Sequence, residues 1–109
     1  AKLQSFNLNI SRIQTLTNSI LKELEDTVQN LKDLKELKLN LSQHNRKVTE
    51  GKILSLVTLI SNMTNITEVE LVLNGFTKLT YDGARQMYEL CRKKPKFLIQ
   101  TDPYTYNYL

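Results

Sequence analysis

One spacing of apolar residues recurs three times in this 109-residue chain, and it constrains the fold more than any other feature. Each copy has an apolar residue at its first, fourth and sixth positions and a short polar residue at its ninth. The three copies are Leu3-x-x-Phe6-x-Leu8-x-x-Ser11, Leu34-x-x-Leu37-x-Leu39-x-x-Ser42 and Ile66-x-x-Val69-x-Leu71-x-x-Asn74. A weaker fourth copy has Lys94 in the first position and keeps Phe97, Ile99 and Asp102. Even spacing of this kind indicates a chain built from one repeated structural unit.

Within each copy, apolar and polar residues alternate, which is typical of a β-strand with one buried face. In the second copy, for example, Leu37 and Leu39 are expected to point inward. The residue at the ninth position is expected to lie where the strand ends. Ser, Asn and Asp suit that place because their side-chain oxygens can accept hydrogen bonds from nearby backbone N–H groups.

Between the copies, the apolar period changes to three or four residues, which predicts amphipathic helices with one inward stripe. The stripes are Leu21, Leu24, Val28 and Leu31, then Ile53, Leu56, Val57, Ile60 and Met63, then Ala84, Met87, Tyr88 and Cys91. The helices are expected to begin at Thr17 or Asn18, at Thr49 and at Asp82, which are good N-cap residues. Strands that alternate with helices predict parallel strands joined by crossovers.

This spacing resembles that of the leucine-rich repeat family, in the ribonuclease-inhibitor-like class with a full helix in each repeat. The resemblance covers roughly residues 3 to 102, and Ile13 and Phe76 also fill the apolar site two residues beyond the ninth position. The chain departs from the family in having His44 at that site of the second repeat, and Ser for most of the family's Asn at the ninth position. Its frequent Asn and Lys residues look like those of protist repeat proteins.

The resemblance implies an α/β fold: a right-handed solenoid of about three and a half strand–helix repeats, with a parallel concave sheet and helices on the convex side. Residues 1–109 would form a single leucine-rich-repeat segment, with repeats at about 3–33, 34–65 and 66–93 and a partial repeat at 94–109. Solenoid repeats bury their faces on their neighbours. Because we recognise no capping segment before Leu3, we expect the segment to belong to a longer chain or a larger assembly.

The outward positions of the predicted strands form a candidate partner-binding surface on the concave face. Its members are Asn7, Asn9, Glu36, Lys38, Asn40, Glu68, Glu70, Val72 and Leu98. Val72 and Leu98 are apolar where an outward residue is expected, so they are candidate anchors for a partner. The alternative interpretation is an ordinary solvated strand face.

The charges of this predicted surface also suggest specific neighbours across strands. Lys38 and Glu70 are expected to lie side by side with opposite sign, which is mildly stabilising. Glu36 and Glu68 are expected to be neighbours of like sign, an arrangement that either is tolerated in water or receives a cation.

Tyr104, Tyr106 and Tyr108 alternate near the end of the chain, as residues on a strand edge do. They are expected to cover the last repeat or to begin a further one. A second interpretation is an aromatic docking strip for a partner, because aromatic residues are enriched at protein interfaces.

All of the net charge of the chain can be traced to one short segment. The chain has 15 basic and 11 acidic side chains, and its formal net charge is +4. Arg92, Lys93, Lys94 and Lys96 supply four of the basic groups, and the remainder is balanced. This basic patch either binds phosphate or an acidic surface, or offsets the dipole at the end of the third helix. It lacks interleaved aromatic residues and any nucleic-acid-binding motif, so nucleic acid is not the expected partner.

The sequence offers little material for catalysis or for a cofactor. One cysteine and one histidine are present, Cys91 and His44. Cys91 lies on the inward stripe of the third helix, which is typical of a small core residue, and His44 is expected in a loop. We therefore expect no catalytic residues, no cofactor and no metal. No apolar run approaches the roughly 20 residues that cross a bilayer, and we expect an intracellular, cytoplasmic protein.

Three functions are compatible with these features. The first is a non-catalytic interaction or scaffold module that binds an unidentified protein partner through its repeat surface, as a subunit of a larger complex. The second is a binder of nucleic acid or another acidic surface through Arg92–Lys96. The third is a small α/β enzyme of compact two-layer fold, for which no catalytic pairing is visible.

Overall fold

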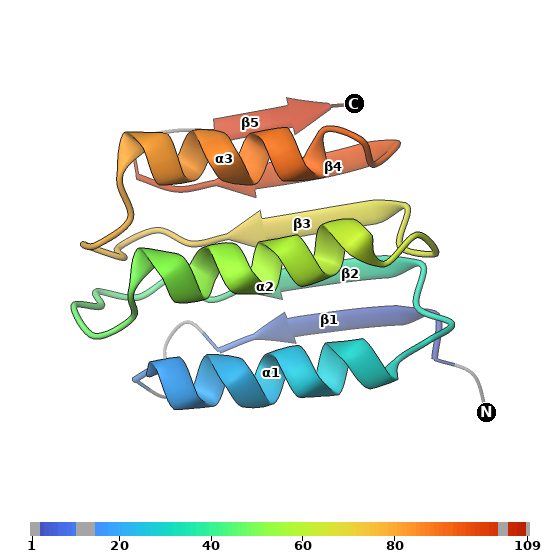
Figure 1. Cartoon of the computed structure of the whole chain (residues 1–109), viewed down its shortest axis with the longest axis horizontal. Coiled ribbons are helices and arrows are strands. Elements are labelled where there is room, and N and C mark those ends of the chain that lie inside the picture. Colours follow the sequence, from blue (N-terminus) through green and yellow to red (C-terminus); the bar gives the residue numbers. More distant parts are fainter. Residues whose placement is uncertain (1–2, 11–14, 103–104, 109) are drawn as a thin grey trace.

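The structure is a computed structural model that describes residues 3–10, 15–102 and 105–108. Strands and helices alternate up to residue 100, and one further strand follows (Figure 1). The elements are β1 (Ser5–Asn9), α1 (Asn18–Asn30), β2 (Glu36–Asn40), α2 (Glu50–Asn62), β3 (Glu68–Val72), α3 (Tyr81–Cys91), β4 (Lys96–Gln100) and β5 (Thr105–Tyr108). We call β1 with α1 unit 1, β2 with α2 unit 2 and β3 with α3 unit 3.

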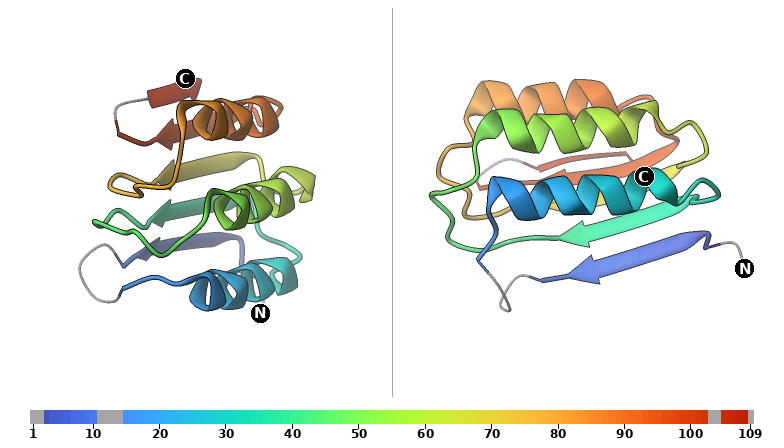
Figure 2. Two further views of the ribbon diagram at one scale, coloured as in Figure 1. Left: turned by 60° about the vertical axis from the view of Figure 1, so that its left-hand side comes forward. Right: turned by 60° about the horizontal axis from the view of Figure 1, so that its bottom comes forward.

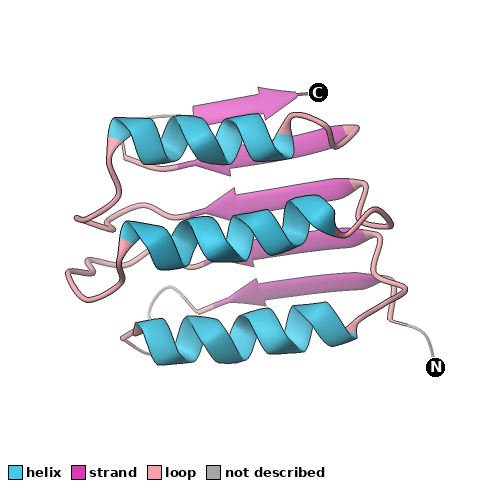
Figure 3. Cartoon of the chain, viewed as in Figure 1, coloured by secondary structure: helices cyan, strands magenta, loops and turns pink. Residues whose placement is uncertain are grey.

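The strands form a single sheet in the order β1-β2-β3-β4-β5, in which β1 to β4 are parallel and β5 is antiparallel to β4. Helices α1, α2 and α3 all lie on one face of this sheet (Figure 2), and the loops gather at the two ends of the strands (Figure 3). The expectation of an α/β chain with parallel strands joined by helices is therefore confirmed. The tail was expected to cover the last repeat or to begin a new one; as β5, it covers β4.

The core lies between the sheet and the helices, and it is built from the repeated apolar positions. In units 2 and 3, the first, fourth and sixth positions of the pattern are no more than 1% exposed: Leu34, Leu37, Leu39, Ile66, Val69 and Leu71. The inward stripe of α2 packs against them, and its residue Val57 is fully buried. Alternation on each strand and a helical period between strands place these side chains in one layer.

Each helix begins after a threonine whose hydroxyl oxygen accepts a hydrogen bond from the first turn. Thr17 and Thr49 hold this N-cap position in α1 and α2, as predicted. The expected start of the third helix at Asp82 was wrong. Thr80 has the extended backbone that an N-cap needs, and its hydroxyl accepts a hydrogen bond from the N–H of Gly83 over 3.0 Å. Asp82 lies in the first turn instead.

The loop after β2 is shifted relative to the loop after β3. Asn40 pairs with Val72, but the next bridge joins Asn45 to Phe76, so Asn45 rather than His44 lies beside Phe76. The stretch from the end of β2 to Thr49 is one residue longer than the stretch from the end of β3 to Thr80. The equivalence that the sequence suggested between His44 and Phe76 is therefore wrong, and His44 is an exposed loop residue.

Candidate functional site

The face of the sheet opposite the helices carries no helix among the described residues; we call it the open face. The parallel register places its residues in three rows. The rows are Ser5, Glu36, Glu68 and Lys96; then Asn7, Lys38, Glu70 and Leu98; then Asn9, Asn40, Val72 and Gln100. The structure thus brings together the nine residues predicted for the strand surface.

Charged side chains in the first two rows form two ion pairs. The Lys96 ammonium lies 2.8 Å from a carboxylate oxygen of Glu68, across the gap between β4 and β3. Lys38 lies beside Glu70 in register, as predicted, but its ion pair is with Glu36 on its own strand, at 3.5 Å. The like-charged neighbours Glu36 and Glu68 are each balanced by a cation in this way.

The Glu68–Lys96 pair shifts both groups toward their charged forms. The hydrogen bond from Lys96 lowers the pKa of Glu68 below its ordinary value of 4.5, with a smaller contribution from a side-chain hydrogen bond with Glu36. The same contact with Glu68 raises the pKa of Lys96 above its ordinary value of 10.5.

These pKa directions predict a pH window for the stability contributed by the pair. The contribution is expected to be present between pH 4.5 and 10.5, the ordinary pKa values of the two groups. It is lost as pH falls through the lowered pKa of Glu68, because the unfolded chain takes up that proton first. Thermal melts of Glu68→Gln and wild type should therefore converge in acid. Glu70→Gln, on the same strand and face, is the matched control for loss of a carboxylate and should lower stability less at neutral pH, because no salt bridge joins Glu70 to the described residues.

An open hollow lies on this face at the carboxyl ends of β2, β3 and β4. Strand residues Glu70, Val72, Leu98 and Gln100 line it, together with residues of the loops that follow, such as His44. In a parallel sheet, the carboxyl ends of the strands meet at the same edge, so loops from different units converge there. The hollow therefore combines side chains from units far apart in the sequence.

Val72 and Leu98 form the apolar part of the hollow, and both side chains are half-buried. They lie on the neighbouring strands β3 and β4, in adjacent rows of the register. Glu70 lies directly beside Leu98 in register, and no salt bridge joins Glu70 to any described residue. An apolar pair next to a carboxylate suits a partner side chain that is both apolar and basic.

The polar ninth positions do only part of what the sequence predicted. The Ser42 hydroxyl oxygen accepts a hydrogen bond from the N–H of Asn74 over 3.0 Å, which links units 2 and 3. The Asn74 side-chain oxygen, in contrast, is buried and accepts no hydrogen bond from the described residues. Asp102 is exposed, and Ser11 lies outside the described residues.

Asn45 fixes the loop after β2, whose residues Gln43 and His44 line the hollow, and the sequence pattern did not single it out. Its amide nitrogen donates to the carbonyl oxygen of Leu16 over 2.9 Å and to the side-chain oxygen of Gln43 over 2.8 Å. Its side-chain oxygen accepts from the N–H groups of Lys47 and Val48, each over 2.9 Å. The sequence did contain a signal for this role. Asn45 lies three residues before the apolar Val48 and four before the N-cap Thr49, and Asn is typical of a turn that leads into a helix.

The basic patch does not present four free cations. Lys94 is 7% exposed, and its ammonium donates to the carbonyl oxygen of Met63 over 2.7 Å. Burial lowers the pKa of Lys94. Arg92 lies 3.3 Å from Glu89, and Lys96 is paired with Glu68. Lys93 alone of the four forms no ion pair or side-chain hydrogen bond with the described residues. These contacts give little support to a broad cationic surface.

The predicted tyrosine strip falls on the antiparallel strand β5. Tyr106 is opposite Ile99 and Tyr108 is opposite Phe97 in the backbone register. Both register partners are buried core residues, whereas Leu98 of the open face is opposite Asn107. Tyr104 lies outside the described residues. The register therefore favours the first interpretation of the tail, in which it covers the last strand.

Cys91 is a buried core residue, as predicted. Burial raises the pKa of its thiol to about 11, an effect that the nearby Lys94 partly offsets. The thiol is therefore neutral at physiological pH and poorly suited to act as a nucleophile. Over the ranges that the structure describes, no cluster of three or more His, Cys, Asp or Glu residues is placed to hold a metal ion. Within those same ranges, every helix is too short or too polar to cross a bilayer.

Comparisons of this chain with protein-family models, with curated proteins and with solved structures give no match.

Proposed function

We propose that this chain is a leucine-rich-repeat-like solenoid segment that binds a protein partner on the open face, without catalysis. The observation that carries the proposal is the half-exposed pair Val72 and Leu98 at the hollow, beside the carboxylate of Glu70. A few well-placed apolar anchors commonly supply most of the binding energy of an interface. Three repeated units with equivalent capping and strand register support the repeat interpretation.

The proposed partner is a peptide segment with an apolar side chain for Val72 and Leu98 and a basic group for Glu70. The other carboxylates of the open face, Glu36 and Glu68, already have cations close to them. Glu70 therefore offers the charge that a bound Lys or Arg can neutralise. An apolar group seated beside that contact would exclude water and strengthen it.

A displayed library of random peptides provides a test that needs no knowledge of the natural partner. Peptides selected on the wild-type chain should combine an apolar residue with a nearby Lys or Arg. Their affinity should fall at least about tenfold for Val72→Asp and for Leu98→Asp, because each change places a charge in the apolar contact. Glu70→Gln should weaken only the peptides that carry a basic residue.

Asn7→Ala is the matched control, because Asn7 shares the open face but lies on β1, away from the hollow. Thermal melts should first establish that every variant folds as the wild type does. Selected peptides that bind the Asp variants as tightly as the wild type would refute the proposal. Preferential binding of a polyanion with a steep salt dependence would instead favour the Arg92–Lys96 alternative.

A further inference from the structure

The two edges of the sheet differ in the strand that forms them. At one edge, the antiparallel strand β5 pairs with β4, and no described helix covers β5. At the other edge, β1 pairs with β2, and no described strand pairs with its far side. The β1 sequence, from Ser5 to Asn9, contains no charged residue and no proline. Natural proteins usually place such residues on an exposed edge strand to prevent pairing with another strand.

Positions that are buried in units 2 and 3 are open in unit 1. Leu3 is 47% exposed, whereas the equivalent Leu34 and Ile66 are at most 1% exposed. Phe6 and Leu8 are half-buried, although their partners in register, Leu37 and Leu39, are fully buried.

The helix of unit 1 shows the same difference. Leu24 is half-buried and lies seven residues after its N-cap. The residues at that position in units 2 and 3, Leu56 and Met87, are 2% and 0% exposed. The open positions of unit 1 therefore belong to both its strand and its helix, and they define one surface, which we call the β1–α1 edge.

Each later unit is joined to the unit before it by contacts that recur. The cap N–H of Thr49 donates to the side chain of Asn18 over 3.1 Å, and the cap N–H of Thr80 donates to Glu50 over 2.8 Å. Asn18 and Glu50 are the first residues of α1 and α2. The strands add a second recurring contact, since the N–H groups of Glu36 and Glu68 donate to the backbone one unit earlier. A preceding unit would give unit 1 the same two contacts.

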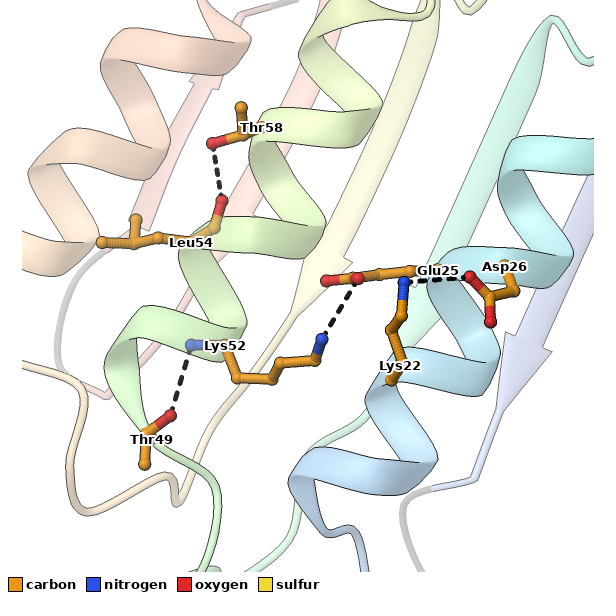
Figure 4. A network of polar contacts seen from close by, with 7 residues as sticks. All are labelled: Lys22, Glu25, Asp26, Thr49, Lys52, Leu54 and Thr58. Atoms are coloured by element: carbon orange, nitrogen blue, oxygen red, sulfur yellow. Dashed lines mark hydrogen bonds and ion pairs between the residues drawn. The ribbon is translucent and has the colours of Figure 1, made fainter.

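We propose that the β1–α1 edge binds a further strand–helix unit, whose strand pairs in parallel with β1 and whose helix packs against α1. The side chains specify the chemistry of that unit. In unit 2, Lys52 lies three residues after the cap and forms an ion pair of 3.2 Å with Glu25 of α1 (Figure 4). In unit 1, the same position is Ile20. Because Ile20 is apolar, the added helix that packs against α1 should carry an apolar residue at the position that Glu25 occupies in α1.

Unit 2 of this chain meets both requirements. Its residue at the position of Glu25 is Val57, eight residues after the cap, and its first helical residue is the acceptor Glu50. Val57 would meet Ile20, and Glu50 would accept from the cap N–H of Thr17. The proposal concerns a surface remote from Val72 and Leu98, so it can fail or succeed independently of the proposed function.

A fusion protein tests this inference directly. A second copy of residues 34–65 is placed immediately before Leu3, which preserves the natural spacing because residue 66 is the equivalent of Leu3. The added unit should raise the thermal midpoint by about 5 °C or more, since solenoid stability grows with each packed interface. Amide exchange at Ser5 and Asn7 should slow as the new strand pairs with β1, because Ser5 is the register equivalent of Glu36, whose N–H donates to the preceding unit, and the N–H groups on one side of a strand belong to alternate residues.

The matched control is the same fusion with Val57→Glu in the attached copy, which should lose part of the gain by placing a carboxylate against Ile20. Adding Ile20→Lys to that control should restore it, because the Lys–Glu pair of units 1 and 2 is then rebuilt. A second fusion, with residues 66–93 in place of 34–65, provides an independent attempt. Its helix has Tyr88 at the position of Val57, so a smaller gain is expected.

Several results would overturn the proposal. One is a thermal midpoint that stays unchanged in both fusions while the amides of the attached unit exchange freely. Failure of both fusions to fold would count equally against the proposal. Another is light scattering that shows the unfused chain to be a dimer whose association protects the β1 amides. In that case, a second copy of the chain is the occupant of the β1–α1 edge.

Discussion

Gly75→Ala is expected to lower the free energy of unfolding by about 2–4 kcal/mol. Gly75 has a φ of 95°, in the left-handed region that residues with a Cβ rarely adopt. A Cβ added there would also collide with the backbone carbonyl group of Gln43 in the neighbouring loop. Neither loop can yield easily, because the N–H of Asn45 donates to the carbonyl oxygen of Gly75 over 2.9 Å.

Chemical denaturation measures this effect, and the reactivity of Cys91 with a thiol reagent provides a second readout. The Cys91 side chain is fully buried, so its labelling under native conditions reports opening of the core. Gly51→Ala is the matched control, because a Cβ at Gly51 meets no atom within 4 Å. This control should leave stability unchanged or raise it by up to about 1 kcal/mol, since Ala favours the helix. Equal stabilities for the two variants would contradict the account of Gly75.

The strands and helices were predictable because each is recorded in a local pattern. Apolar residues alternate at Leu37 and Leu39 and recur with a helical period from Ile53 to Ile60. Each pattern by itself shows which face of the strand or helix is buried. The register of the open face followed from the same pattern, because equivalent strands of a repeat pair in step. These features require no knowledge of contacts between distant residues.

The predictions that were wrong concern features that depend on contacts between residues far apart in the sequence. Asp82 is as good a cap residue as Thr80 by type, and only the extended backbone at Thr80 and its contact with Glu50 of unit 2 select between them. Likewise, the extra residue after β2 moves Asn45 into the place predicted for His44. Two cations of the basic patch are occupied by contacts with the preceding unit. Lys94 donates to the carbonyl oxygen of Met63, and Lys96 pairs with Glu68.

The candidate site was predictable in its residues but not in its shape. The outward positions, including Val72 and Leu98, can be read from alternation alone. The hollow depends on how the loops after β2, β3 and β4 converge, and those loops follow no repeated pattern. Which apolar residues of the open face line the hollow is therefore decided by loop geometry, to which the contacts of Gly75 and Asn45 contribute.

Asn45→Ala is expected to lower the free energy of unfolding by about 3 kcal/mol. The Asn45 side chain is 2% exposed and makes four hydrogen bonds, to Leu16, Gln43, Lys47 and Val48. Alanine removes all four, and water cannot easily replace them because Leu16 and Val48 are fully buried. The variant should also loosen the segment before α1 from the loop after β2, where the N–H of Leu16 would still donate to the Gln43 side chain over 2.8 Å.

Asn74→Ala is the matched control for this prediction, because Asn74 also follows a strand but its side-chain oxygen accepts no hydrogen bond from the described residues. It should cost less than about 1 kcal/mol in the same denaturation experiment. Asn45→Asp distinguishes the hydrogen bonds that the Asn45 amide accepts from those that it donates. The Asp side chain can still accept from Lys47 and Val48, but it turns a carboxylate oxygen toward the Leu16 carbonyl. If the donated bonds matter, Asn45→Asp will be as unstable as Asn45→Ala at neutral pH. Equal losses for Asn45→Ala and Asn74→Ala would instead show that the loop is held by its backbone contacts with Gly75 and Thr77.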